Sequence, residues 1–266
     1  VRGPPAPPPT KPTASSYSWV LIGASLMGSS TAWFLSDNPD FSGSVLVVEK
    51  DPTYEFSSTA HTNSCIRQQF SHTLNVRISQ FAADFVKNLR ARMGDDDRVP
   101  NVDIQSYGYL YLADNEGFAQ TLRDNHKVQL AAGAETELLT AEDIAARYPF
   151  YNVDDILLGS INTKDEGYWD GGVVFDWFRR SARERGVEYV QGEVVAMARD
   201  GGKVTSVTLA SGNVVHCGPV VNASGPRAAR PSEMAGTPTP AGPPLFRPPP
   251  GSGAGLPSTL FRFPPY

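Results

Sequence analysis

One stretch constrains this 266-residue chain most: a glycine-rich turn that joins an apolar strand to a helix. The apolar run 19–22 (Trp-Val-Leu-Ile) is followed by Gly-Ala-Ser-Leu-Met-Gly at 23–28, and a helical pattern continues to Leu35. A second apolar run, 45–48 (Val-Leu-Val-Val), ends in Glu49. Strand, turn, helix and strand make a βαβ unit, and unbroken apolar runs are typical of parallel strands buried on both faces. The sequence therefore predicts an α/β fold.

The residues of the turn also indicate chemistry. Gly23 permits a tight turn and Gly28 permits close packing of the helix on the strand, so that backbone N–H groups and the helix N-terminus can hold a pyrophosphate. Glu49 follows Gly28 by 21 residues, where a carboxylate accepts hydrogen bonds from ribose hydroxyls. Ser25 replaces the middle glycine of the usual pattern. We predict nucleotide binding; the alternative is a plain strand–helix turn that binds nothing.

Periodicity predicts the remaining elements. Helices are expected at 75–93, 116–132, 141–147 and 173–185, and strands at 107–113, 156–163, 193–198, 204–209 and 219–222. The glycines at 201 and 202 indicate a hairpin that joins two strands of a β-meander. No helix is expected at 57–69, although a domain that binds NAD would continue with one.

Proline is concentrated at the two ends, with six of the 23 prolines in residues 1–12 and twelve in 226–266. Segments of this composition bury too little apolar surface to fold, so residues 1–16 are expected to be a disordered tail and 231–266 an irregular one. A net charge of −5 argues against a nucleic-acid partner, which requires a basic face. Two cysteines without other ligands nearby predict neither a disulfide framework nor a metal site. Residues 19–35 are uncharged but too short and too rich in hydroxyls for a transmembrane segment.

Four segments in order resemble the D-amino-acid oxidase family of FAD-dependent oxidoreductases. They are 20–50, the loop 58–67, the phrase Asp-Glu-Gly-Tyr-Trp-Asp at 165–170, and Val-Val-Asn-Ala-Ser-Gly at 220–225. The family includes sarcosine oxidase and glycine oxidase, and the closest group within it is that of FAD-dependent oxidoreductase domain-containing proteins. The resemblance implies FAD as the cofactor rather than NAD.

The resemblance also implies an organisation. A Rossmann-like FAD-binding domain of the glutathione-reductase type would consist of residues 17–97 and 171–230, and 98–170 would be part of an α+β substrate domain. The family continues beyond the last motif with further strands and a segment that grips the flavin, where this chain has a proline tract. We therefore expect the chain as given to be a fragment that is inactive or a poor enzyme.

Site residues follow from position in the family's motifs. The turn and the acid after the second strand would hold the ADP half of FAD, through Gly23, Ala24, Ser25, Gly28, Glu49 and Lys50. The following loop would line the path to the isoalloxazine, through Ser58, Thr59, Asn63, Ser64 and Cys65. Val194 on the meander would contact adenine, and the last motif would close over the pyrophosphate through Ala223, Ser224 and Gly225.

Two loop residues are candidates for catalysis. Arg67 has the charge to stabilise a reduced flavin or a substrate carboxylate, or it forms an ordinary salt bridge. His61 could act as an acid or base, although a lone loop histidine more often faces solvent. The expected activity is oxidation of a C–N bond in a small amine or amino acid by hydride transfer to flavin. The alternative is an assembly factor that keeps the flavin fold and binds a respiratory-chain partner. The expected location is intracellular, in the cytoplasm of a bacterium or the mitochondrion of a eukaryote.

Overall fold

The structure is a computed structural model that describes residues 8–237. One end of the molecule is built on a parallel sheet with the strand order β13-β2-β3-β9. Its strands are β2 (Trp19–Ile22), β3 (Val45–Glu49), β9 (Glu188–Gln191) and β13 (Val220–Asn222). Leu21 and Val47 enter the core on one face of the sheet, and Val20 and Leu46 enter a second core on the other. Burial of both faces explains the unbroken apolar runs in the sequence.

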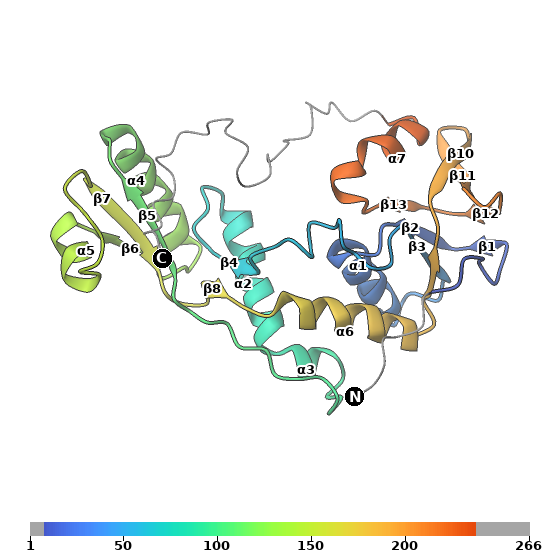
Figure 1. Cartoon of the computed structure of the whole chain (residues 1–266), viewed down its shortest axis with the longest axis horizontal. Coiled ribbons are helices and arrows are strands. Elements are labelled where there is room, and N and C mark those ends of the chain that lie inside the picture. The colour runs from blue at the N-terminus through green and yellow to red at the C-terminus, as the bar shows by residue number, and fades with distance from the viewer. Residues whose placement is uncertain (1–7, 238–266) are drawn as a thin grey trace.

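Two helices cover the first face of this sheet (Figure 1). They are α1 (Leu26–Asp37) and α6 (Gly171–Glu184), which pack on one another. The Trp33 ring lies 5.5 Å from the Phe178 ring, centroid to centroid, and its indole N–H donates to Ser181 Oγ at 3.1 Å. The β-strand–turn–helix unit therefore shares a core with a helix about 150 residues later in the chain.

An antiparallel meander covers the second face. Its strands are β10 (Val194–Asp200), β11 (Lys203–Leu209) and β12 (Val214–Cys217), and β1 (Ser16–Tyr17) pairs in parallel with β12. Gly201 and Gly202 have positive φ values and make the predicted hairpin turn. The two sheets with α1 and α6 form what we call the parallel-sheet lobe. The predicted Rossmann-like α/β fold is confirmed.

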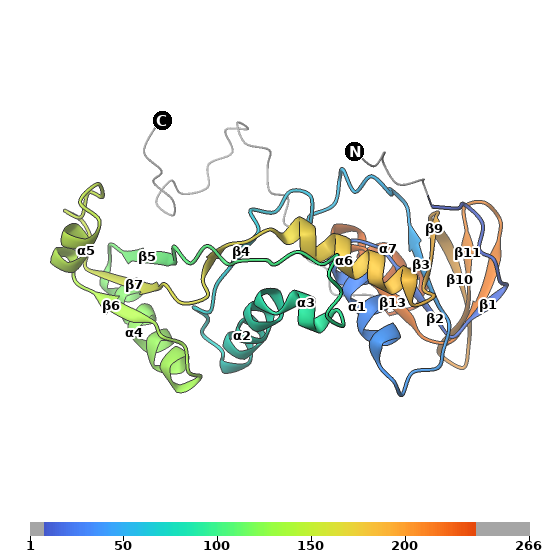
Figure 2. The ribbon, with the colours of Figure 1, turned by 90° about the horizontal axis from the view of Figure 1, so that it is seen from below.

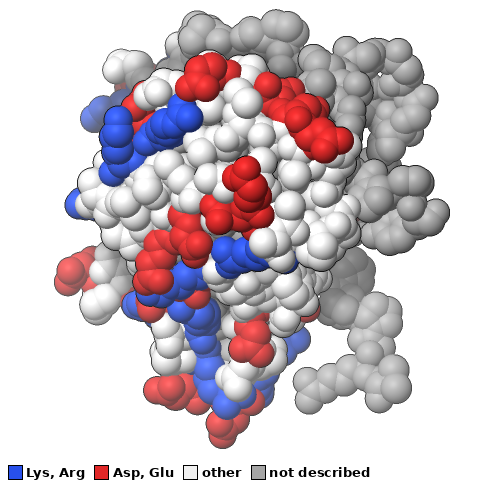
Figure 3. All heavy atoms as spheres, turned by 90° about the vertical axis from the view of Figure 1, so that its left-hand side faces the viewer, with Lys and Arg blue, Asp and Glu red and all other residues white. Residues whose placement is uncertain are grey.

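A smaller lobe lies at the other end of the molecule, on the left in Figure 1. This outer lobe is an antiparallel sheet of order β5-β7-β6 with two helices. Its elements are β5 (Tyr109–Ala113), α4 (Glu116–Ala131), β6 (Glu137–Leu139), α5 (Ala141–Arg147) and β7 (Leu158–Asn162). On its outer face, charges of both signs are interspersed among uncharged side chains (Figure 3).

Three extended segments connect the lobes, and Figure 2 shows them running along the long axis. We call these segments, residues 64–72, 103–108 and 163–170, the neck. Within it β4 (Cys65–Ile66) pairs with β8 (Gly167–Tyr168), and Gln105 bridges to Tyr168. Helix α2 (Thr73–Lys87) follows the neck, and α3 (Leu89–Arg92) follows α2.

The predictions of irregular structure at the two ends of the chain are partly wrong. Of the expected tail 1–16, the described part is anchored to the parallel-sheet lobe: Pro9 accepts a hydrogen bond from the Gln191 N–H, and Thr13 binds Glu188. The free edge of β12 gives β1 backbone partners that composition alone does not reveal. Residues 1–7 lie outside the described residues.

At the other end, the 3₁₀ turn Gly225–Arg227 leads into α7 (Ala229–Met234), so the expected irregular segment 231–266 begins inside a helix. Pro231 occupies the first turn of α7, where a backbone N–H has no intrahelical partner to lose. Residues 238–266 lie outside the described residues. The predicted helix 75–93 is two helices, because the chain leaves helical geometry at Asn88, whose side chain donates to the Asp84 carbonyl.

Candidate functional site

The glycine turn has no room for side chains at its two key positions. Gly23 has φ +98°, and a Cβ there would lie 2.5 Å from the Ala223 carbonyl oxygen. A Cβ on Gly28 would lie 1.8 Å from the Gly23 carbonyl oxygen. Ser25 is the N-cap of α1, and its buried hydroxyl has no hydrogen-bond partner among the described residues. A buried polar atom at a helix N-terminus is satisfied by a ligand that accepts a hydrogen bond, such as a phosphate.

Glu49 ends β3 beside this turn. One oxygen of its carboxylate accepts the Ala24 N–H at 2.7 Å, and the other accepts the Asp51 N–H at 2.8 Å. A carboxylate can accept about four hydrogen bonds, so two acceptor positions stay open for hydroxyl donors. The carboxylate is thus aimed at the turn by the backbone itself.

The meander begins next to Glu49. The Gly192 N–H donates to the Glu49 carbonyl at 2.8 Å, and Lys50 forms an ion pair with Glu193 at 2.9 Å. Val194 is buried in the core that includes Val48. The structure therefore places Glu49, Lys50 and Val194 at adjoining positions, and their roles toward adenosine stay predictions.

The last motif lies on the opposite side of the turn. The Ala223 N–H donates to the Ile22 carbonyl at 2.8 Å, which places Ala223 directly against Gly23. Ser224 Oγ donates to Asn222 Oδ1 at 2.6 Å, and Gly225 has φ +56°. Residues from β2, β3, β10 and β13 thus meet at the carboxyl edge of one parallel sheet, the usual position of a nucleotide site.

The loop 57–65 leads away from the turn toward the neck. The Leu26 N–H donates to Thr59 Oγ1 at 3.4 Å, so Thr59 lies at the N-terminus of α1. Ser58 and Asn63 are exposed, and the Asn63 carbonyl accepts from Cys65 Sγ at 3.3 Å. Ser64 has φ +48°, and its carbonyl accepts the Trp169 N–H. The predicted path along this loop therefore runs from the turn to the neck.

A pocket of about 290 Å³ opens in the neck. The Arg67 guanidinium donates to the Tyr111 hydroxyl at 2.5 Å and lies 4.9 Å from the centre of the Phe70 ring. Among the described residues Arg67 has no carboxylate partner. The pocket is lined by Cys65, Ile66, Arg67, Phe70, Ser79 and Tyr109. An unpaired guanidinium among aromatic rings is suited to a small organic anion.

His61 does not join this pocket. Its side chain is exposed, and Nε2 lies 2.6 Å from the carbonyl oxygen of Glu55, six residues earlier in the same loop. A larger hollow, of about 600 Å³, lies between β13, the meander and α7 and includes none of the predicted site residues.

The sequence did not single out Glu166, which is fully buried in the neck beside the pocket. Its carboxylate accepts the Gln68 N–H at 2.5 Å and the Gln69 amide at 3.1 Å. Burial raises the pKa of this carboxyl to about 7, although those two donors and the charge of Arg67 act to lower it. Burial likewise raises the pKa of the Tyr111 hydroxyl. An Asp-Glu-Gly string is typical of an exposed turn, so only its pairing with Gln68 and Gln69 could have indicated a buried acid.

A family model matches most of the chain. The model of the DAO family, described as "FAD dependent oxidoreductase", matches residues 18–258. The chain belongs to this family. FAD is accordingly its cofactor. A relative, the FAD-dependent oxidoreductase domain-containing protein 1 of Xenopus laevis, is 33% identical over 239 residues, which are 82% of this chain and 48% of that protein. The chain spans about half the length of the curated relatives it matches.

Solved structures share the fold. L-proline dehydrogenase from P. horikoshii has a TM-score of 0.68 at 24% identity, with 87% of this chain and 57% of that chain covered. The dithionite-reduced L-alpha-glycerophosphate oxidase from Mycoplasma pneumoniae with FAD bound has a TM-score of 0.62 at 18% identity, with 84% and 58% covered.

The residues at the turn fit FAD. The two glycines allow the turn to pack closely against Ala223 and the start of α1, Ser25 has a hydroxyl to donate, and Glu49 has free acceptor positions. The individual roles of these residues toward FAD stay predictions. Among residues 8–237, no group of three potential metal ligands was found, and none of the helices has the length and hydropathy that a membrane crossing requires.

Proposed function

We propose that this chain forms the nucleotide-binding part and the anion-binding wall of a flavoenzyme that oxidises a C–N bond in a small amino acid. The observation that carries the proposal is the Arg67 guanidinium, which lies in the neck pocket without a carboxylate partner among the described residues. The loop that contains Arg67 continues directly from the loop predicted to line the flavin path. A substrate carboxylate bound at Arg67 would thus lie at the flavin end of the cofactor site.

In this mechanism each part of the chain has a separate task. The turn at Gly23 and the carboxylate of Glu49 would hold the ADP half of FAD, and residues 57–65, which begin beside that turn, would line the path of the other half. Arg67 would bind the substrate carboxylate, and the rings of Phe70 and Tyr111, which lie beside its guanidinium, would contact the apolar part of the substrate. Bound FAD supplies a ring that accepts a hydride from the carbon next to the amine. Loss of that hydride from carbon and of a proton from nitrogen to solvent would leave an imine, which water hydrolyses to a carbonyl compound and an amine or ammonia.

The names of two enzymes with this fold support the proposal that the substrate carries an anionic group. A dehydrogenase named for L-proline and an oxidase named for L-alpha-glycerophosphate are both named for small compounds with an anionic group, a carboxylate in one and a phosphate in the other. Arg67 could bind either. The aromatic lining and the limited pocket of about 290 Å³ favour the smaller and less charged carboxylate.

Anaerobic reduction of bound flavin tests the proposal. A panel of amino acids, the corresponding amines without a carboxylate, and glycerol phosphate is mixed with the FAD-loaded whole flavoenzyme of which this chain is proposed to form a part. Bleaching of the flavin absorbance by one or more amino acids is expected. Bleaching by glycerol phosphate alone would contradict C–N chemistry. No bleaching by any compound would contradict catalysis and favour the assembly factor that binds a respiratory-chain partner.

The Arg67 variants sharpen this test. Arg67→Met should weaken binding of a carboxylate substrate by about 2–3 kcal/mol, the usual contribution of a charge-assisted hydrogen bond. Arg67→Lys keeps the charge and should lose less. The amines without a carboxylate are the matched control, because their reaction should be insensitive to either substitution. Reoxidation of the reduced protein by oxygen or by a quinone then distinguishes an oxidase from a dehydrogenase coupled to a membrane carrier.

A further inference from the structure

The neck contains a buried acid that none of the steps above uses. Glu166 is fully buried, and its carboxylate accepts two hydrogen bonds from the residues that follow Arg67: the Gln68 N–H and the Gln69 side-chain amide. Its own carbonyl accepts the Gly108 N–H. Glu166 thus joins all three segments of the neck at one point, beside the pocket.

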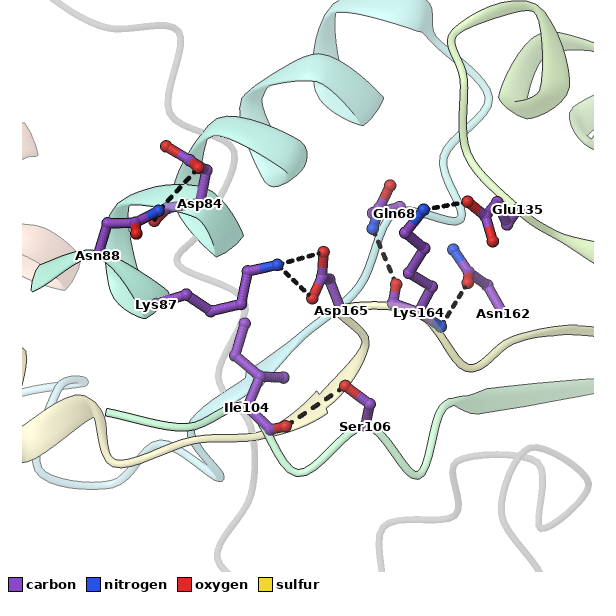
Figure 4. Close-up of polar contacts among 10 residues, drawn as sticks. All are labelled: Gln68, Asp84, Lys87, Asn88, Ile104, Ser106, Glu135, Asn162, Lys164 and Asp165. Atoms are coloured by element: carbon purple, nitrogen blue, oxygen red, sulfur yellow. Dashed lines mark hydrogen bonds and ion pairs between the residues drawn. The ribbon is translucent and has the colours of Figure 1, made fainter. Parts of the chain in front are cut away.

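No ion pair among residues 8–237 includes Glu166. The two charged residues directly before it in the chain are directed elsewhere (Figure 4): Lys164 pairs with Glu135, and both carboxylate oxygens of Asp165 accept from Lys87 at 2.8 Å. The positive charge of Arg67, an exposed side chain directly before Gln68 in the chain, also lowers the pKa of Glu166, though less than the hydrogen bonds do. Arg67 in turn has only neutral neighbours in contact, the Tyr111 hydroxyl and the Phe70 ring.

This arrangement makes the charge of Glu166 depend on what Arg67 binds. A buried carboxylate without a paired cation costs desolvation energy, which a nearby positive charge partly offsets. When an anion occupies Arg67, the net charge of that site falls from +1 to zero. The offset is lost, and the protonated form of Glu166 is then favoured.

We propose that binding of a carboxylate at Arg67 is coupled to the uptake of a proton by Glu166, which makes Glu166 a positioning residue that sets the pH range of substrate binding. The inference rests on the proposed function, because it takes Arg67 as the substrate's anion site. The carboxyl with a pKa of about 7 is the group placed to change charge near neutral pH. Other titratable groups at the pocket are Tyr109 and Tyr111, whose pKa values burial raises above 10, and the thiol of Cys65.

The direct test is the titration of Glu166 itself. Protein loaded with FAD and labelled with ¹³C at the glutamate carboxyl carbon is titrated by NMR from pH 5 to pH 9, and Glu166→Gln assigns the resonance. Acetate is the probe and neutral acetamide its control. We expect a midpoint near 7 without ligand, a rise of roughly half a unit or more with saturating acetate, and no change with acetamide. Equal midpoints with both ligands, or a midpoint in the ordinary carboxyl range, would overturn the inference.

A second readout separates coupling from a merely structural role. Wild-type affinity for acetate should fall by roughly threefold to tenfold between pH 6 and pH 8.5, as linkage to a shift of that size requires. Glu166→Gln should bind acetate with little pH dependence, and at pH 8.5 it should bind more tightly than wild type. A structural role predicts weaker binding by the variant at every pH.

The outcomes also distinguish this inference from the proposal on which it rests. If acetate affinity does not depend on Arg67, as judged with Arg67→Met, both fail. If acetate binds at Arg67 while the Glu166 midpoint stays constant, only the coupling fails.

Discussion

The parallel-sheet lobe and the neck are both buried, but they are buried by different means. In the sheet the hidden side chains are aliphatic, with Leu21, Leu46 and Val47 fully enclosed. In the neck and the adjoining strand β7, polar side chains are buried beside apolar ones, and they include Gln68, Glu166 and Asn162. Aliphatic burial is insensitive to pH and to exact geometry, whereas each buried polar group needs a partner in the right place.

The contrast corresponds to two tasks. The sheet must present the turn at Gly23 and the carboxylate of Glu49 in a fixed position, and a dry core buried on both faces provides that rigidity. The neck must hold a charge near a substrate, and polar groups with adjustable protonation suit it. Stability should thus reside mainly in the first region and sensitivity to conditions in the second.

The largest expected effect is on the sheet. Leu21→Ala should lower the free energy of unfolding by about 2–5 kcal/mol, because the fully buried side chain leaves a cavity between β2 and the helices. Urea denaturation measures it. Val214→Ala, at a half-exposed position on β12, is the control and should cost less than about 0.5 kcal/mol. Similar losses for the two variants would contradict the idea that this core carries the stability.

The second-largest expected effect is the pH dependence of stability that Glu166 in the neck causes. The pKa of Glu166 is 4.5 when unfolded and about 7 when folded. Between these two pH values the folded state keeps a proton that the unfolded state has released. The contribution of the protonated Glu166 carboxyl to the free energy of unfolding is therefore full below pH 4.5 and is lost as the pH rises to 7. The loss is about 3 kcal/mol, integrated over that window. The difference in unfolding free energy between wild type and Glu166→Gln, followed from pH 4.5 to 8, should change by this amount. A difference that stays constant would mean that the pKa of Glu166 is not raised by folding.

The sequence predicts the parallel-sheet lobe better than it predicts the neck. The apolar runs at 19–22 and 45–48 predicted β2 and β3 almost to the residue, because burial on both faces leaves a local signature. The strand Glu137–Leu139 was missed, since three residues between two helices show no alternation. The burial of Glu166 depends on Gln68 and Gln69, about 100 residues earlier, and no local pattern encodes that meeting.

A third prediction concerns the adenosine end of the site. Glu49→Ala should weaken FAD binding by about 1.5–3 kcal/mol, the range for hydrogen bonds to a charged acceptor. Glu55→Ala, an exposed acid in the following loop, is the matched control and should leave the affinity unchanged. Fluorescence titration of FAD measures both, and an unchanged affinity in Glu49→Ala would remove this carboxylate from the site.

The smallest effect is expected at the surface of the neck. Lys164 and Glu135 form an ion pair whose side chains are each 61% exposed. Lys164→Ala should therefore change the unfolding free energy by less than about 1 kcal/mol, and less still in high salt. A loss as large as that of Leu21→Ala would mean that the neck, rather than the sheet, limits stability.

The central claim is that the turn at Gly23 and its neighbours hold the ADP half of FAD. Amide ¹H–¹⁵N spectra of the labelled chain, recorded with FAD, ADP and FMN, test it most directly. FAD and ADP should both shift the amides of Ala24, Ser25, Glu49 and Ala223, while the outer-lobe amides at 137–147 stay in place. FMN, which lacks the adenosine, should not shift the turn, and Gly28→Ala, whose Cβ would collide with the Gly23 carbonyl oxygen, should abolish the response. Shifts confined to other parts of the chain, or no response to FAD and ADP at millimolar concentration, would contradict the account.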